Sequence, residues 1–464
     1  MVGVTRIATY FPRRRLDRAL IGKAWGTRVP AGTRTVAGID EDALTMAVDA
    51  VLACVGDTDP AGYDALYFAS TSSPYLEKQV ASVVATAVDL RRDVAVADIG
   101  GSVRAGLTGL RLALDGVRAG SVGTALVAAA DARLAEPESE LEPLLGDGAA
   151  AVAVGSQGVI AELVSAASVA EEFTYLWRTD EQRALHVTEP RFGTTYGYAR
   201  DMVEAIGAAL RKAELPPSRV AKLALGAPDA RGAAEAAKRA GFDARQLETP
   251  LVHEAGILGS AEPLALLSRS LETAAPGDFV VVAAWGEGAD ALVFRATDAL
   301  PAGRPRPLAD CLARGMMLPS YERYLRARAV LPAEPIGEPV PTMIEWKELS
   351  QDVRLYASRC EACGLVQYPQ ARVCLGCQAR DRMSPHKLAR RGTVFTFTID
   401  NLAPVLEHPM PMAVIDLVGG GRLYLQVADA AEGEVKVGAP VELTYRRLHE
   451  GGGNRNYFWK ARPT

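Results

Sequence analysis

Gly146-Asp-Gly-Ala-Ala-Ala-Val-Ala-Val154 decides the fold, because its pattern returns as Gly286-Glu-Gly-Ala-Asp-Ala-Leu-Val-Phe294. In both places a Gly-x-Gly turn leads into a short apolar run, which predicts a buried β-strand. Self-similar stretches within one chain indicate repeated structural units. We therefore predict that the large N-terminal region consists of two related halves.

Two further elements repeat in the same order in each half. An earlier apolar strand ends in small residues at 68–71 in the first half and at 225–228 in the second. Between this strand and the Gly-rich strand lies a small-residue turn that enters a long helix, at 100–106 and at 256–260. One Gly-x-Gly pair alone could be a chance echo, but three elements in register indicate a duplicated α/β unit.

Short apolar strands alternate with amphipathic helices throughout residues 1–297, which is the pattern of an α/β protein. At 464 residues the chain is also too long for one ordinary core, so we expect two or three domains. We expect strands at 65–69, 124–129, 223–225 and 279–283, and helices at 44–54, 107–119, 195–213, 231–240 and 261–274.

Composition excludes several classes of protein. The net charge of −5 gives no basic stripe for nucleic acid. No run of 18 apolar residues occurs, so we expect no membrane span, and the first 20 residues lack the order of a secretory signal. Four of the six cysteines cluster tightly, which favours the cytoplasm and one metal site over a disulfide framework.

The clustered cysteines predict a metal site of the structural kind. Cys360 and Cys363 form one CxxC turn, and Cys374 and Cys377 form a second after a spacer of ten residues. Four thiolates complete a closed tetrahedral shell around Zn²⁺, with no position open for substrate. The alternative, two unrelated CxxC redox motifs, explains their proximity less well. We expect a structural zinc that organises a stretch too short to build its own core.

Five short segments with period-2 alternation follow the cysteines and predict a small antiparallel barrel. The expected strands are 392–399, 412–417, 422–427, 441–445 and 457–461. The motifs at 359–364, 368–369, 374–377 and 392–398 resemble domain-of-unknown-function family 35, whose members are associated with acyl-CoA enzymes. This resemblance implies a rubredoxin-like zinc ribbon followed by an OB-type β-barrel. It also implies that the module contributes to binding a CoA thioester.

The duplicated region resembles the thiolase fold, and within it the 3-hydroxy-3-methylglutaryl-CoA synthases of the archaeal type. The resemblance spans roughly residues 1–330 and rests on the motifs at 72–75, 105–106, 146–150, Pro263 and 321–325. It implies two α/β halves stacked in αβαβα layers. It also implies carbon–carbon chemistry on acyl thioesters, for which the family uses a cysteine at a helix N-terminus as acyl carrier.

Laid on the family motifs, the chain lacks the residues for that chemistry. The nucleophilic cysteine falls on Val103, and the glutamate base falls on Thr71. The histidine falls on Gly226 and the asparagine on Ile257. A shift of the alignment does not restore the nucleophile, because no cysteine occurs between positions 54 and 311. We therefore predict that the chain does not form an acyl-cysteine at the family's site, which would make it a pseudoenzyme in that sense.

Two interpretations of this loss remain open. In the first, the large domain is kept for its shape and pairs with an active thiolase-fold protein. In the second, its pocket performs another reaction, such as retro-aldol cleavage, which needs a general base and a group that holds an enolate but no nucleophile. Candidates for such roles are Asp98, Asp229, His253 and Glu254, although a His-Glu pair at this place is more often an interface or capping pair.

The expected organisation has five parts. These are a thiolase-like N-terminal half (1–160), a C-terminal half (161–297), a helical extension with a Pro-rich connector (298–345), a zinc ribbon (346–385) and an OB-fold barrel (386–464). The connector at 330–342 is expected to be a semi-rigid spacer. It would keep the ribbon and barrel beside the large domain at high effective concentration.

Three functional hypotheses follow. The first is a scaffold subunit of an acyl-CoA thiolase or acyltransferase complex, which pairs with a thiolase-fold partner or forms a homodimer through the thiolase-type face. The second is a cysteine-independent retro-aldolase or lyase that acts on a 3-hydroxyacyl-CoA. The third is an acyl-CoA binder without turnover. The acyl group, the partner and the pathway are left open by the sequence.

Overall fold

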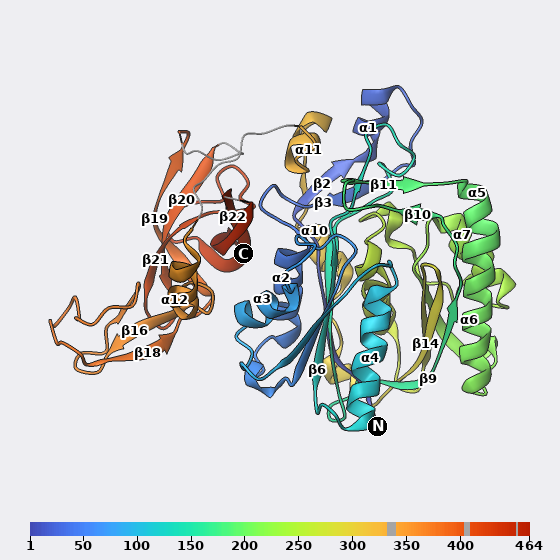
Figure 1. The fold of residues 1–464 in the computed structure, drawn as a ribbon, viewed down its shortest axis with the longest axis horizontal. Coiled ribbons are helices and arrows are strands. Elements are labelled where there is room, and N and C mark those ends of the chain that lie inside the picture. The colour runs from blue at the N-terminus through green and yellow to red at the C-terminus, as the bar shows by residue number, and fades with distance from the viewer. Residues whose placement is uncertain (332–339, 403–408, 452) are drawn as a thin grey trace. The chain divides into compact units, whose positions relative to one another are not determined.

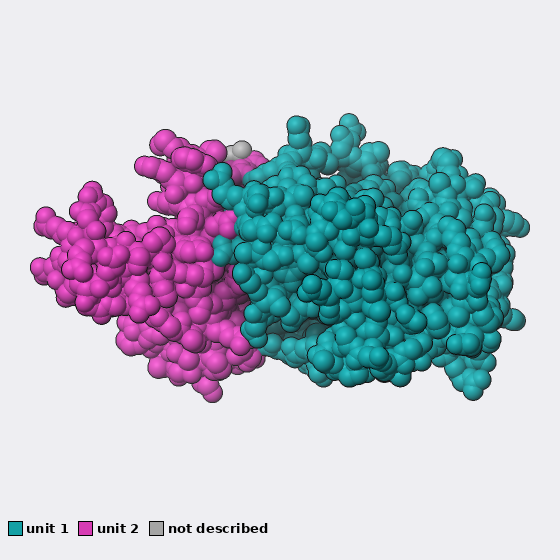
Figure 2. Space-filling model, turned by 90° about the horizontal axis from the view of Figure 1, so that it is seen from below, with its two compact units in different colours: residues 1–37, 42–328 teal, residues 38–41, 329–464 magenta. Residues whose placement is uncertain are grey.

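The computed structural model describes residues 1–331, 340–402, 409–451 and 453–464. The chain forms two compact units, coloured separately in Figure 2: residues 1–37 with 42–328, and residues 38–41 with 329–464. Most of the Pro-rich spacer expected at 330–342 lies outside the described residues.

A nine-stranded sheet runs through the first unit in the order β12-β13-β14-β9-β1-β8-β6-β4-β5 (Figure 1). Its strands are β1 (Gly3–Tyr10), β4 (Ala65–Ala69), β5 (Ala95–Ile99), β6 (Ala125–Asp131), β8 (Gly148–Gly155), β9 (Ala161–Ala170), β12 (Val220–Leu225), β13 (Phe279–Trp285) and β14 (Gly288–Ala296). The four strands expected in this region are all present.

The sheet consists of two halves with the same pairing pattern, joined by the short β1–β9 contact. In the first half, β8 pairs antiparallel with β1 and β6, and β4 pairs parallel with β6 and β5. In the second, β14 pairs antiparallel with β9 and β13, and β12 pairs parallel with β13. A single parallel bridge, Leu223 to Leu247, occupies the position that β5 has in the first half. The two Gly-rich stretches form β8 and β14, so the duplication read from the sequence is confirmed.

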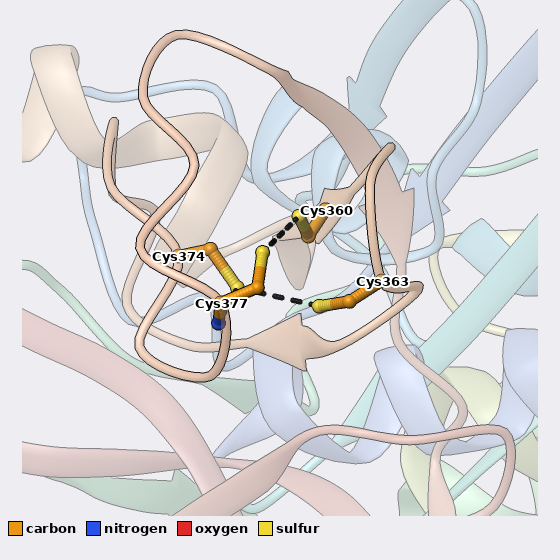
Figure 3. Close-up of side chains that lie close together, drawn as sticks. All are labelled: Cys360, Cys363, Cys374 and Cys377. Carbon is orange, nitrogen blue, oxygen red and sulfur yellow. Dashed lines mark hydrogen bonds between the residues drawn. The ribbon is translucent and has the colours of Figure 1, made fainter.

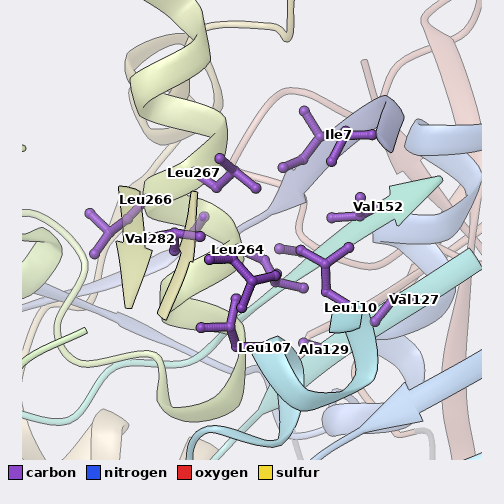
Figure 4. Packing of buried hydrophobic residues seen from close by; sticks show 14 of the residues in the cluster. Ile7, Leu107, Leu110, Val127, Ala129, Val152, Leu264, Leu266, Leu267 and Val282 are labelled. Atoms are coloured by element: carbon purple, nitrogen blue, oxygen red, sulfur yellow. The ribbon is translucent and has the colours of Figure 1, made fainter. Parts of the chain in front are cut away.

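Helices of the two halves also correspond. They are α2 (Ala43–Val55), α3 (Val80–Ala87) and α4 (Ala105–Ala119) in the first half, and α6 (Ala199–Lys212), α7 (Ala230–Arg239) and α8 (Glu262–Thr273) in the second. Helices α4 and α8 contact each other and supply Leu107, Leu110, Leu264 and Leu267 to one large apolar cluster (Figure 4). Strand residues such as Val127 join the same cluster. Burial of these apolar side chains is the main stabilising contribution of the layers.

Small residues let the central helices approach neighbouring backbone. A Cβ on Gly106, in the first turn of α4, would lie 2.1 Å from the carbonyl oxygen of Ser260. Helix α4 is therefore held directly against the turn that opens α8, and only glycine fits at this point.

Helix α6 begins later than expected. The expected helix at 195–213 is α6 preceded by a π-helical turn, Gly193–Tyr198, in which one wider turn interrupts the α-helical hydrogen-bond pattern. The remaining elements of the unit are short and connect the main layers. They are β2 (Arg14–Asp17), α1 (Arg18–Trp25), β3 (Thr33–Val36), η1 (Pro60–Gly62), β7 (Leu134–Ala135), β10 (Leu176–Trp177), β11 (Ala184–Val187), α5 (Pro190–Phe192), η3 (Pro217–Arg219), η4 (Leu251–His253), η5 (Gly259–Ala261), α9 (Leu300–Gly303), α10 (Leu308–Ala313), β15 (Met316–Met317) and α11 (Tyr321–Ala327).

The second unit contains a small three-stranded sheet and a five-stranded antiparallel sheet, in the orders β17-β16-β18 and β21-β20-β19-β22-β23. All five expected barrel strands are present. Its elements are α12 (Thr342–Asp352), β16 (Tyr356–Cys360), β17 (Val366–Gln367), β18 (Met383–Lys387), β19 (Arg391–Asp400), β20 (Met410–Leu417), β21 (Arg422–Gln426), β22 (Pro440–Gly451) and β23 (Asn454–Pro463).

A buried charge cluster ties residues 38–41 into this unit. The guanidinium of Arg446 on β22 binds the carboxylates of Glu41 and Asp429, and all three side chains are buried. Lys460 on β23 binds Asp40 at 2.9 Å. Buried ions of this kind need each partner, because removing one leaves an uncompensated charge.

Candidate functional site

A cavity of about 380 Å³ lies in the first unit where loops of the two halves meet. It is lined by Thr71, Val103, Gly226 and Ile257, the four positions predicted from the sequence to correspond to the family's catalytic residues. Thr71 and Gly226 lie just after the corresponding strands β4 and β12, and Val103 and Ile257 lie in the turns before α4 and α8. The structure therefore brings all four positions to one site, two from each half.

Neither free thiol outside the cluster reaches this cavity, and no cysteine or histidine occurs among its described lining residues. Cys54 is buried in α2, and its burial raises the pKa of the thiol to about 12. Cys311 lies in α10, where the hydroxyl of Thr9 contacts its sulfur at 3.9 Å and partial burial raises its pKa. A raised thiol pKa keeps the nucleophilic thiolate scarce at neutral pH.

Apolar and aromatic side chains make up most of the cavity wall. They come from the segment before β8, from β10, β11 and the following turn, and from the end of β13: Leu141, Leu144, Leu145, Tyr175, Leu176, Leu185, Val187, Pro190 and Trp285. Ligand pockets of this composition bury the apolar part of a small molecule and orient it through a few polar groups.

Three ionisable lining residues that were not singled out from the sequence are buried. Glu262 begins α8, Arg133 follows β6, and Tyr198 closes the π-helical turn before α6. Glu262 is 3% exposed, and this burial raises the pKa of its carboxyl to about 8, although the Arg133 guanidinium acts in the opposite direction. Burial also raises the pKa of Tyr198, and the negative charge of Glu262 is the second cause.

The polar atoms of this group are incompletely satisfied. Within the described part of the chain, the hydroxyl of Tyr198 and the Nε of Arg133 are buried without a hydrogen-bond partner. Arg133 donates one long hydrogen bond, 3.4 Å, to the carbonyl of Ile257. Buried polar groups are normally paired, so unpaired ones beside a cavity point to a ligand or water.

One buried carboxylate fixes the loops around the site. Asp131, at the end of β6, accepts hydrogen bonds from the Thr71 hydroxyl at 3.0 Å and from the backbone N–H of Ser260 at 2.7 Å. It also accepts bonds from Ser70 and Ser72. Asp131 thus joins the loop after β4 to the start of α8, and so positions cavity residues from both halves.

The polar candidates proposed from the sequence are placed elsewhere, with one exception. His253 and Glu254 do not line the cavity; they line a second pocket with Arg15, and Glu254 pairs with Arg269 at 2.6 Å. Gly256, which follows this segment, has a φ of +92°, a backbone conformation that glycine adopts readily.

The two aspartates proposed from the sequence both cap helices. Asp98 accepts bonds from the N–H groups of Val80 and Ala81 at the start of α3 and does not line the cavity. Asp229 is the exception, because it lines the cavity while also capping α7 through Gly232.

The four cysteines of the second unit converge as their spacing predicted (Figure 3). Their sulfur atoms all lie within 4.8 Å of one another, with 3.6 Å between Cys360 and Cys377 and 3.5 Å between Cys363 and Cys374. Thiolates about 2.3 Å from a tetrahedral zinc lie about 3.8 Å apart. The cluster therefore has the donor set and size for a four-coordinate metal.

Comparison with known proteins identifies the fold of the first unit. The structure of an HMG-CoA synthase complexed with CoA aligns with a TM-score of 0.66 at 16% identity, covering 73% of this chain and 92% of that one. The 3-oxoacyl-[acyl-carrier-protein] synthase III of Aquifex aeolicus aligns with a TM-score of 0.58 at 19% identity, covering 64% and 100%. The first unit has the thiolase fold.

Sequence comparison gives the nearer relationship. Hydroxymethylglutaryl-CoA synthases of Pyrobaculum neutrophilum and Aeropyrum pernix are 28% and 29% identical to this chain over 344 and 347 residues. Each match covers 71% of this chain, and 98% and 94% of the relatives. The family model of the ChsH2 C-terminal OB-fold domain matches residues 386–446. The chain is a thiolase-fold homologue of hydroxymethylglutaryl-CoA synthases with a C-terminal OB-fold domain. Among the described residues, no helix has the length and apolar character needed to cross a membrane.

Proposed function

We propose that this chain binds an acyl-CoA thioester in the cavity of its thiolase-fold unit and does not form an acyl-cysteine there. The observation that carries the proposal is that Thr71, Val103, Gly226 and Ile257, the positions predicted to replace the family's catalytic residues, line one cavity, with an aliphatic side chain at Val103. Valine offers no lone pair for attack on a thioester, whereas the cavity has an apolar wall that suits the acyl part of such a ligand.

Calorimetry with an acyl-CoA tests binding, and intact-mass spectrometry after incubation tests for an acyl adduct. We expect binding and no adduct. A stable adduct on Cys54 or Cys311 would contradict the proposal, because it would show an acyl carrier that the cavity does not contain.

We propose further that the chain works as a scaffold subunit beside another thiolase-fold protein. The edge strand β5 pairs on one side only, with β4, in the described structure, and its residues are partly exposed. Exposed edge strands are templates for pairing with another chain. Co-purification followed by mass measurement tests this: a hetero-complex with a thiolase-fold protein supports it, and a homodimer alone or a monomer at working concentration contradicts it.

For the second unit, we propose that Zn²⁺ occupies the site formed by Cys360, Cys363, Cys374 and Cys377 and has a structural role. Backbone bonds support both CxxC turns, with Gly364 donating to Cys360 and Gln378 donating to Cys374. Four thiolate donors leave no open position, so the metal would stabilise the fold of the ribbon rather than bind substrate. One zinc per chain by elemental analysis is expected.

A second candidate function is cysteine-independent cleavage of a 3-hydroxyacyl-CoA, and the buried carboxyl of Glu262 favours it. In this reaction a base takes the proton of the 3-hydroxyl, the C2–C3 bond breaks to release a carbonyl compound, and the electron pair enters the thioester as an enolate. A proton then returns to C2 and leaves a shorter acyl-CoA. Release of benzaldehyde from 3-hydroxy-3-phenylpropionyl-CoA by the purified chain alone would distinguish this function from a scaffold role.

A further inference from the structure

We propose that Glu262 and Tyr198 form an acid–base pair that removes a proton from C2 of a bound acyl-CoA and holds the resulting enolate. This inference deepens the proposed function and rests on acyl-CoA binding in the same cavity. It assigns the chemistry to two residues outside the four family positions. The pair combines a side chain from the start of α8 with one from the turn before α6.

The position of Glu262 suits proton transfer. Its side chain is 3% exposed yet lines the cavity, so a bound thioester would meet the carboxyl in a site with little water. A carboxyl kept away from water holds its proton to higher pH than a solvated one and becomes a stronger base once ionised. Catalytic bases work best when their pKa lies near the working pH, and the carboxyl pKa of about 8 meets that condition.

Tyr198 supplies the complementary donor. Its side chain is fully buried, lines the cavity, and its hydroxyl has no hydrogen-bond partner in the described structure. Burial and the charge of Glu262 raise the pKa of the phenol, which therefore keeps its proton and can donate it in a hydrogen bond. A pre-positioned donor of this kind stabilises the negative oxygen that forms on a thioester carbonyl.

A third side chain, Arg133, adds a positive charge to the site. Arg133 is buried in the same wall, and its unpaired Nε leaves donor capacity for an anionic ligand. Its positive charge favours the ionised carboxylate of Glu262 and would also favour an enolate. Tyr198 is the final residue of the π-helical turn Gly193–Tyr198, a rare backbone feature that occurs often at functional sites.

The proposed step is balanced without any further reactant. The C2–H bond breaks and its proton moves to a carboxylate oxygen of Glu262. The electron pair moves into the thioester group as an enolate, whose oxygen accepts a hydrogen bond from Tyr198. Return of a proton from Glu262 to C2 restores the acyl-CoA. In D₂O the carboxyl exchanges its proton with solvent, so repeated cycles place deuterium at C2.

The test uses the full chain and 3-phenylpropionyl-CoA, whose apolar acyl group matches the cavity wall. Binding is measured by calorimetry, and deuterium at C2 by mass spectrometry after incubation in D₂O. We expect the wild-type chain to bind the probe and to accelerate exchange. Glu262→Gln should bind similarly and lose about 10²- to 10⁴-fold in exchange rate. Tyr198→Phe should lose about 10- to 10³-fold.

Matched controls separate chemistry from folding. Glu235→Gln, on the exposed face of α7, and Tyr196→Phe, an exposed tyrosine two residues before Tyr198, should exchange at the wild-type rate. If the wild-type chain binds no acyl-CoA, the proposed function fails and this inference fails with it. If the chain binds the probe but exchange is absent, or is unchanged in Glu262→Gln, only the assignment of Glu262 and Tyr198 is overturned.

Discussion

Glu262→Gln should make the first unit more stable, by an amount that grows with pH. The pKa of this carboxyl is about 8 in the folded chain against 4.5 for an ordinary glutamate. A raised pKa in the folded state means that the neutral form is favoured there. The stabilisation of the fold that comes from keeping this carboxyl neutral is fully present below pH 4.5 and is lost as the pH rises to 8. Each pH unit in this window costs the wild-type chain about 1.4 kcal/mol relative to the unfolded state, so about 3 kcal/mol is lost by pH 7 and about 5 kcal/mol above pH 8.

Glutamine has nearly the same shape and cannot ionise, so the variant escapes this loss. Urea denaturation at several pH values from 4.5 to 9, followed by tryptophan fluorescence, gives the difference in unfolding free energy between variant and wild type. We expect the difference to be small at the acidic end and to favour the variant by several kcal/mol at the basic end. Glu235→Gln, on a solvated surface, should show no such trend. A difference that stays constant across this range would refute the claim that the carboxyl is buried in its neutral form.

Three further predictions concern other parts of the chain. Cys374→Ser, or chelation of the metal, should abolish both the metal content and the folded structure of the ribbon, measured by elemental analysis and circular dichroism. The thiolase-fold unit should keep its thermal transition. A ribbon that stays folded without metal would contradict the structural role of the metal. Val103→Cys should introduce a thiol that iodoacetamide labels far faster than Cys54, because burial raises the pKa of the Cys54 thiol to about 12. Equal labelling of the two thiols, measured by peptide mapping, would place Val103 outside the cavity. Arg446→Met should destabilise the second unit by about 3–5 kcal/mol, because two buried carboxylates lose the guanidinium that pairs with them. An unchanged melting temperature would contradict a stabilising role of this charge cluster.

Much of the architecture could be predicted because it depends on local patterns. The repeated Gly-x-Gly strands, the apolar helices α4 and α8, and the alternating barrel strands each carry their own signal in neighbouring residues. The two CxxC turns likewise bring four thiols together through short-range geometry. The positions Thr71, Val103, Gly226 and Ile257 were assigned through the resemblance to a known family, and the structure places all four on the wall of one cavity.

The ionisable residues of the cavity could not be predicted in the same way. Glu262 precedes Pro263 at the start of a helix, where acidic residues are common and usually solvated. The one signal in the sequence is the apolar Leu266, four residues later on the same helical face, which would direct that face toward the protein interior. Arg133 and Tyr198 reach the cavity only through contacts between distant segments. His253 was a candidate because histidine is rare in this chain and lies near the expected pocket in sequence, but in the structure it lines a second pocket instead.

The π-helical turn before α6 joins two parts of one helical segment that contact different structures: the part before it lines the cavity, and α6 itself packs on the sheet. Residues after Tyr198, such as Met202 and Ile206, must keep their phase against β9 and β14, where they are buried. Pro190 and Thr194, before the end of that turn, form part of the cavity wall. Removing one residue from the turn would rotate the upstream part by about 100° relative to α6. The extra residue therefore determines which side chains of the upstream segment face the cavity, while the residues of α6 keep their positions against the sheet.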